Sequence, residues 1–431
     1  MEFKIREDIN VRAWSWYLKN IKDFREADIA QSVSYFVEKI NEIPKGEKKI
    51  GVVFGMLSFH SLCCMLALVK TGRDYVIFYD VKHSDDSHQP LADCSHVFFL
   101  RKVEEDLTLL VENLQGPTYD IVCTADFEQR INSHPGREPL SFEFSKTQRT
   151  YIVMFMGQPE IAYTTGEIEA SSIQAAMDHY YHEDDVCVFV RPFKHVGVAT
   201  LAIYPAVFKT KDVTLCYSRD DWDDQHARAT NIHVAFDMIK EQWPMPKNVR
   251  MLTTGGYHFN SQCIDYVTSN STVENIVDCY GTAFCPPPLA IRHLSKDNPS
   301  PAFRWINDFV KMQNISDALY LKTADADTFL GLESEVNGML YTGDKISTVD
   351  ADHFMFLGSA RRYVRTRHTR IEDYTFVKLF KRNAGVSECA IEFRVIDNVE
   401  VPILKVRQKD LAITKQFILN TSSEITVELL T

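Results

Sequence analysis

The sequence lacks several features that would assign its class directly. Its ten cysteines form no Cys-x-x-Cys pair, which excludes the usual zinc-ribbon spacing. No apolar run approaches the ~20 residues of a membrane-spanning helix, and the N-terminal residues are too charged for a signal peptide. Most cysteines lie in apolar runs, as small hydrophobic residues do in a reducing compartment. These absences predict a cytoplasmic protein without a membrane partner.

Positive charge is also scarce. The 431-residue chain carries 47 Lys and Arg against 59 Asp and Glu, which gives a formal net charge of −12. Nucleic acids and anionic membranes attract basic surfaces, so this balance argues against both as partners of the whole chain. One local exception is a strip of five arginines between Arg361 and Arg370, where phosphate groups of a nucleotide, of coenzyme A or of a nucleic acid could bind.

One common catalytic signature is missing, and one possible metal motif has a simpler interpretation. The nucleophile pattern Gly-x-Ser-x-Gly does not occur, so a hydrolase of that type is not indicated. His179 and His182 lie three positions apart at the expected end of a helix. They could present two metal ligands, but we interpret them as a solvated helix terminus.

What the sequence does contain is a regular alternation of strand and helix patterns. Strands with continuous apolar runs that alternate with helices indicate parallel sheets covered by helices. The rhythm restarts near residue 150, which predicts two α/β subdomains of similar size. In the first we expect strands at 48–55, 75–81, 96–100 and 120–125 with helices at 29–42, 56–70 and 104–114, and in the second strands at 150–156, 185–190, 212–217 and 249–254 with helices at 169–181, 197–208, 228–242 and 260–270.

Beyond about residue 300 the pattern becomes rich in strands, and after Gly358 it indicates a small α+β domain. We therefore predict an N-terminal body at 1–357 and a C-terminal domain at 358–431. Within the body the subdomain boundaries are expected at about 1–148, 149–295 and 296–357.

The most specific motif is LYTGDKISTVDADHFMFLGSARRYVRTRHTRIE at 340–372. It resembles the adenylate-forming enzymes (acyl- and aryl-CoA synthetases, luciferases and peptide-synthetase adenylation domains) in its Thr-Gly-Asp run, its later glycine and its basic strand ending in Arg-Ile-Glu. In that family the aspartate, here Asp344, binds both ribose hydroxyls of the nucleotide, which suits a carboxylate that accepts two hydrogen bonds. The alternative is that Asp344 is a β-turn residue after Thr-Gly. The matching positions are Tyr341, Thr342, Gly343, Asp344, Gly358, Arg370, Ile371 and Glu372.

Other blocks follow in the family's order over roughly residues 30–400. VRPFKHVG resembles the segment with the acyl-pocket histidine, here His195, and VRMLTTGG resembles the Gly-Gly block behind the adenine. IVDCYGTAF resembles the Tyr-Gly-x-Thr-Glu strand end, with Tyr280 near the adenine and Thr282 near the α-phosphate. The alternatives are a core histidine, a strand-to-helix turn and a packing tyrosine. The resemblance implies nucleotide-binding roles for Gly157, Gly255, Gly256, Tyr280, Gly281, Thr282, Asp344 and Arg361, catalytic roles for Thr282, His195 and Arg365, and hinge roles for Gly358 and Arg361.

Several positions that carry the family's chemistry are altered. The stretch that matches the phosphate loop, MFMGQPEIAYTTGEIEASS at 154–172, lacks the family's hydroxyl-rich part and places Glu160 where a lysine is usual, beside a triphosphate. Phe284 replaces the glutamate that binds Mg²⁺ and cannot coordinate a hard cation. Ser359 replaces an arginine, and the family's late lysine motif has no counterpart. Either the chain is an adenylating enzyme with rearranged phosphate contacts, or it is a descendant kept for nucleotide binding or as a scaffold.

The resemblance implies an α/β fold with two layered subdomains, a β-rich subdomain and a shortened α+β lid that rotates about its hinge. It implies ATP or AMP as the nucleotide and leaves Mg²⁺ open because of Phe284. The implied activity is that of an AMP-forming ligase acting on a small carboxylic acid, with coenzyme A or a carrier protein as the acceptor.

Overall fold

The computed structural model divides the chain into two compact units, one made mostly of Met1–Ile232 and the other of His233–Thr282 and most of the chain after Pro288. The residues that the structure describes are 1–6, 9–14, 29–46, 48–54, 58–78, 94–100, 118–121, 130, 133–136, 139–153, 161–190, 196–216, 219–256, 259–282, 285–323, 335–336, 339–359, 363–365, 370–397, 399–421 and 425–430.

The first unit contains a six-stranded sheet in the order β6-β5-β3-β4-β8-β9. All neighbours are parallel except β8 and β9, which pair antiparallel. Every residue of β5 is buried, as expected for a strand covered on both faces. The strands span Ile50–Phe54 (β3), Tyr75–Phe78 (β4), His96–Leu100 (β5), Thr118–Ile121 (β6), Arg149–Val153 (β8) and Ile161–Thr165 (β9).

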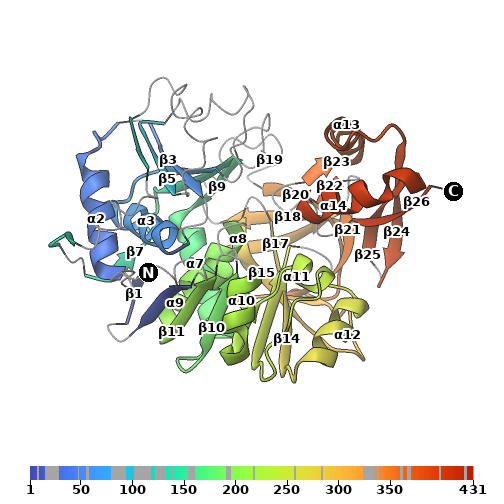
Figure 1. Ribbon diagram of the computed structural model, residues 1–431, viewed down its shortest axis with the longest axis horizontal. Helices are drawn as coiled ribbons and strands as arrows, with labels where there is room; N and C mark the ends of the chain where they lie inside the picture. The colour runs from blue at the N-terminus through green and yellow to red at the C-terminus, as the bar shows by residue number, and fades with distance from the viewer. Residues whose placement is uncertain are drawn as a thin grey trace. The chain divides into compact units, whose positions relative to one another are not determined.

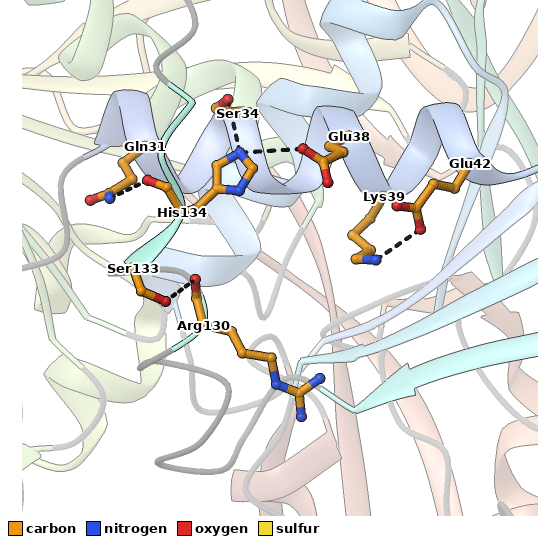
Figure 2. Close-up of polar contacts among 8 residues, drawn as sticks. All are labelled: Gln31, Ser34, Glu38, Lys39, Glu42, Arg130, Ser133 and His134. Atoms are coloured by element: carbon orange, nitrogen blue, oxygen red, sulfur yellow. Dashed lines mark hydrogen bonds and ion pairs between the residues drawn. The ribbon is translucent and has the colours of Figure 1, made fainter.

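Helix α2 (Ile29–Glu42) packs on this sheet through Phe36, whose ring lies 5.8 Å from that of Phe98 on β5. The same helix holds the segment around His134 (Figure 2). Gln31 Nε2 donates to the His134 carbonyl at 2.6 Å, and Ser34 Oγ lies 3.3 Å from His134 Nε2. These contacts anchor residues 133–136 to α2.

Helix α3 (Ser58–Thr71) is mostly apolar, and from Phe59 to Val69 every residue is buried. A helix with no polar face must be covered all round. It packs beside α2 (Figure 1) and also contacts β2 and β11 of a second group of strands, so it lies between two layers of the first unit. Burial raises the pKa of the Cys63 and Cys64 thiols on this helix.

The second group of strands in the first unit runs β12-β10-β11-β2, all parallel. Helix α10 contacts β10 and β11, and helices α7 and α9 contact each other. A two-stranded antiparallel sheet, β1 with β7, completes the described strands of this unit. The elements span Glu2–Lys4 (β1), Asn10–Trp14 (β2), Ser141–Glu143 (β7), Gly166–Tyr180 (α7), Val186–Val190 (β10), Val196–Val198 (α8), a π-helical turn at Ala199–Ile203, Tyr204–Lys209 (α9), Asp212–Cys216 (β11), Arg219–Gln225 (α10), a 3-10 turn at His226–Arg228 and Asn231–His233 (β12).

The second unit begins with strands in the order β17-β18-β20-β21-β16-β15-β14-β13, with the short β19 on β20. β13 and β14 are parallel, whereas the pairs from β15 to β17 are antiparallel. The elements span Phe236–Lys240 (α11), Met251–Gly255 (β13), Ser261–Asn270 (α12), Asn275–Thr282 (β14), Cys285–Leu294 (β15), Phe303–Trp305 (β16), Val310–Ile315 (β17), Ala318–Thr323 (β18), Glu335–Val336 (β19), Met339–Thr348 (β20) and His353–Ser359 (β21).

The end of the chain has its own small core. Phe376 and Phe380 on α13 are buried together with Leu404 on β25 and Ile418 on α14. This is the α+β arrangement predicted after Gly358. The elements span Tyr363–Arg365 (β22), Arg370–Glu372 (β23), Asp373–Ala384 (α13), Cys389–Ile396 (β24), Val399–Val406 (β25), a 3-10 turn at Gln408–Asp410, Leu411–Thr421 (α14) and Thr426–Leu429 (β26).

The layered α/β fold expected from the sequence is present. Among the described residues one predicted element is wrong: the helix expected over 228–242 is instead a 3-10 turn, the strand β12 and the short helix α11. The helix expected at 104–114 lies outside the described residues. None of the helices in the described part of the chain combines the length and the hydropathy of a membrane-spanning segment.

Candidate functional site

Asp344 lies inside a strand and not in a turn. It belongs to β20 and pairs with Ser359 of β21. Thr342 donates its hydroxyl to the Leu319 carbonyl and accepts the Asp344 N–H at 3.1 Å, so the strand is held on both sides. Gly343 has a φ of +78°, a conformation that residues with a side chain rarely adopt. The local conformation of the Thr-Gly-Asp run therefore fixes the position of Asp344.

Asp344 is bound to Tyr280, a residue from a second motif 64 positions earlier in the chain. The Tyr280 hydroxyl donates to Asp344 Oδ2 at 2.5 Å, a short hydrogen bond. Asp344 is 0% exposed and Tyr280 is 5% exposed. Two of the residues to which the sequence assigned nucleotide binding thus meet in the second unit, and each occupies part of the other's polar surface.

The Tyr280 ring packs within an aromatic cluster. Its centroid lies 5.9 Å from Phe303, 5.5 Å from Phe354 and 6.3 Å from Phe356. In this arrangement the ring serves as a core residue, one of the two roles considered for it. Stacking on an adenine would require the ring to leave this packing.

A buried ion pair lies on the same strand as Tyr280. Asp278, two residues earlier on β14, receives Arg292 Nε at 2.8 Å and Nη2 at 2.7 Å. Arg292 also donates to Ser300 at 3.0 Å and lies over the Phe303 ring at 4.4 Å. Residues two apart on a strand face the same way, so this pair supports the tyrosine. Sequence reasoning missed it, although an arginine inside the apolar run PPPLAIRHL signals a buried partner.

The Gly-Gly block lies on the neighbouring strand. Gly255 ends β13 and pairs with Cys279 of β14. A Cβ at Gly255 would lie 2.7 Å from the Cys279 carbonyl oxygen, so no larger residue fits without moving backbone. Gly256 follows with a φ of +81°. Gly255 allows β13 to approach β14 next to Tyr280. Strand packing therefore explains this glycine without a bound ligand.

Gly281 and Thr282 end β14, and Thr282 is 8% exposed. In the Tyr-Gly-x-Thr-Glu pattern the threonine is the third residue after the tyrosine. Counting from Tyr280 puts that position at Ala283, one residue after Thr282. The catalytic role assigned to Thr282 therefore stays a prediction.

Other predicted site residues are placed only in part. Gly157, His195, Arg361 and Phe284 lie outside the described residues, as does Glu160. The strand positions of two more are known. Arg365 of β22 pairs with Arg370 of β23. Gly358 lies close to β25, and a Cβ added to Gly358 would lie 3.2 Å from the Cβ of Glu400.

Metal binding finds little support in the described residues. They bring together no group of three His, Cys, Asp or Glu side chains that could hold an ion. The glutamate that the resemblance implies as the Mg²⁺ ligand is replaced by Phe284, whose side chain has no oxygen. The described residues do not fit this metal. A ribose fits better, because the Asp344 carboxylate is an acceptor of the right chemistry.

No protein-family model matches the sequence, and no curated protein is significantly similar to it. Solved structures do match. The chain superposes on the amide bond synthetase McbA from Marinactinospora thermotolerans with a TM-score of 0.66 at 12% identity, covering 93% of this chain and 90% of that one. ATP-bound MatB from Rhodopseudomonas palustris gives 0.64 at 12% over 93% and 88%. A benzoate CoA ligase from Burkholderia xenovorans LB400 gives 0.63 at 10% over 93% and 90%.

The chain therefore has the fold of the adenylate-forming enzymes over nearly its whole length. The fold predicted from the Asp344 motif and the blocks before it is confirmed. At 10–12% identity the likeness concerns the fold and not the reaction.

Proposed function

We propose that this chain is an ATP-dependent, adenylate-forming ligase-like protein that activates a small carboxylic acid as its acyl-AMP. The observation that supports it best is the meeting of Tyr280 and Asp344 across 64 residues of sequence. Both residues stand where the resemblance assigns contacts to the nucleotide. Two motifs that the resemblance assigns to one site are thus in direct contact.

In the proposed reaction the acid's carboxylate oxygen forms a bond to the α-phosphorus of ATP, and the bond to pyrophosphate breaks. Asp344 would hold the ribose hydroxyls, and the end of β14 with Thr282 would lie near the α-phosphate. His195 would line the acid pocket, and Arg365 would stabilise phosphate charge. An acceptor such as coenzyme A or a carrier protein would then take the acyl group and release AMP.

The altered residues lower the expected rate. One lost contact to transition-state charge costs about 3–4 kcal/mol, or roughly 10²–10³ in rate. Glu160 and Phe284 replace two such contacts, and the late lysine is missing. Effects within one site are not additive, but turnover far slower than in an enzyme with a full set of contacts is expected.

The second candidate is a protein that kept the fold for binding or as a scaffold and no longer adenylates. The complete burial of Asp344 beneath Tyr280 favours it, since a ribose carboxylate has to be reachable. Glu160, Phe284 and the missing late lysine favour it as well, because each removes a contact that the resemblance assigns to the triphosphate or its metal ion.

The two candidates differ in one assay. The full chain would be incubated with ATP, labelled pyrophosphate and a broad panel of carboxylic acids, with Asp344→Ala as the control. Acid-dependent exchange of label into ATP that the control lacks supports the ligase. No exchange with any acid, at a sensitivity of one turnover per hour, leaves the binding protein.

A further inference from the structure

We infer that Tyr280 is an internal competitor for the ribose: its hydroxyl takes the acceptor position on Asp344 that a ribose hydroxyl of the nucleotide would use. The inference rests on the proposed nucleotide site and concerns how that site is controlled. It makes Tyr280 the residue that sets affinity for nucleotides with intact ribose hydroxyls.

The contact has the chemistry of the bond that it would replace. A phenol hydroxyl and a sugar hydroxyl are both neutral O–H donors, and each can give one hydrogen bond to a carboxylate oxygen. At 2.5 Å the Tyr280–Asp344 contact is at the short end for an O–H donor and an ionised acceptor. A ribose hydroxyl that bound at Oδ2 would have to displace the phenol.

Displacement also moves the ring. Tyr280 is held against Phe303 and Phe354, and the buried Asp278–Arg292 pair lies on the same face of β14. The phenol hydroxyl therefore leaves Asp344 only when the aromatic packing yields. This couples opening of the nucleotide site to the core of the second unit.

The competition predicts a gain on removing one oxygen atom. In Tyr280→Phe the ring still fills its place among the phenylalanines, but the hydroxyl is gone. Hydrogen bonds to charged groups are strong enough to shift a binding equilibrium by roughly 10- to 100-fold. ATP should therefore bind Tyr280→Phe at least tenfold more tightly than it binds the wild-type chain.

The gain should depend on the ribose hydroxyls. 2′,3′-Dideoxy-ATP keeps the base and the phosphates but has no hydroxyl to offer Asp344. Its affinity should be the same for both chains within about twofold, since it neither uses the carboxylate nor competes with the phenol.

The test is isothermal titration of the full chain with ATP and with 2′,3′-dideoxy-ATP. The variants are wild type, Tyr280→Phe, Asp344→Asn and the matched control Tyr266→Phe. The control removes a hydroxyl that donates to the Trp243 carbonyl at 2.8 Å, elsewhere in the same unit. A thermal melt of each variant confirms that it is folded. The expected result is a gain for ATP in Tyr280→Phe alone, with weaker ATP binding in Asp344→Asn than in wild type.

Three results would overturn the inference, and the first two separate it from the proposed function. If wild type binds ATP, Asp344→Asn does not, and Tyr280→Phe binds as wild type does, the competition is wrong and the nucleotide site stands. If no variant binds ATP, including Tyr280→Phe, both the competition and the nucleotide site are wrong. A gain in Tyr280→Phe of equal size for the dideoxy nucleotide also rules out competition with the ribose.

Discussion

Arg292 on β15 is joined to Asp278 on β14 through two nitrogens on one carboxylate oxygen, and both side chains are 3% exposed. The pair lies two residues from Tyr280 along β14 and shares Phe303 with it. Loss of either partner of a buried ion pair destabilises the fold, because the other charge stays buried without compensation. It therefore positions the strand that carries the tyrosine.

Arg292→Met should destabilise the chain by about 3–5 kcal/mol, because it leaves the Asp278 carboxylate buried without its cation. Urea unfolding of the purified chain measures this. The matched control is Arg394→Met, since Arg394 holds Glu428 through two bonds of 2.7 Å at an exposed face and should give no measurable change. Equal losses in the two variants would show that burial does not decide the strength of these pairs.

The Tyr280–Asp344 bond should appear as a coupling energy in a double-mutant cycle. Tyr280→Phe, Asp344→Asn and the double variant would be compared by the same unfolding method. We expect a coupling of about 1.5–3 kcal/mol, since one partner is a buried carboxylate. A coupling near zero would mean that the short contact contributes nothing to the fold.

His60 predicts a loss of stability in acid. It is fully buried, burial lowers its pKa from 6.5 to about 4, and neither ring nitrogen has a partner among the described residues. In the unfolded chain the His60 ring binds a proton below pH 6.5, whereas in the folded chain it binds one only near pH 4. Stability from this group is therefore complete above pH 6.5 and falls between pH 6.5 and 4, by on the order of 3 kcal/mol.

His60→Phe tests this origin. The variant should lose the part of the acid sensitivity that arises between pH 6.5 and 4 and should be as stable as wild type, or more so, at pH 8. The reason is that an apolar ring replaces two unsatisfied nitrogens. Unfolding midpoints at several pH values measure the slope, and an unchanged slope would assign the acid sensitivity to other groups.

Gly255→Ala should destabilise the chain by about 1–3 kcal/mol, because its Cβ would meet the Cys279 carbonyl oxygen at 2.7 Å and backbone must move. Gly46→Ala is the control, since nothing lies within 4 Å of its Cβ. That change should be neutral or stabilising by up to about 1 kcal/mol. The melting temperatures of both variants measure these changes. If Gly255→Ala melts at the wild-type temperature, β13 and β14 can move apart without loss of stability.

Much of the fold could be predicted because its segments are locally consistent. The helix at 29–42 was predicted with the bounds that α2 has, and α3 was expected at 56–70 and spans Ser58–Thr71. The helix predicted at 228–242 is wrong because contacts with distant parts of the chain determine the structure there. Asn231 is buried and donates to the Tyr180 carbonyl and to Asp185, and β12 pairs with β10. Helical periodicity in the sequence carries no record of these distant partners.

For the candidate site the sequence predicts which residues take part, and their arrangement comes from the structure alone. The order of the motifs pointed to Tyr280 and Asp344, yet nothing in either motif said that one would donate to the other. The burial of Asp344 arises from the packing of β14, β20 and β21, which no single segment encodes. Arg292 was missed because its partner is 14 residues away on another strand.

A crystal structure of the full chain soaked with ATP, at a concentration well above that needed to saturate the wild type, would show directly where the nucleotide binds. We expect the ribose hydroxyls within hydrogen-bonding distance of the Asp344 carboxylate and the Tyr280 hydroxyl displaced from it. A nucleotide bound elsewhere, with the Tyr280–Asp344 contact still in place, would contradict this expectation.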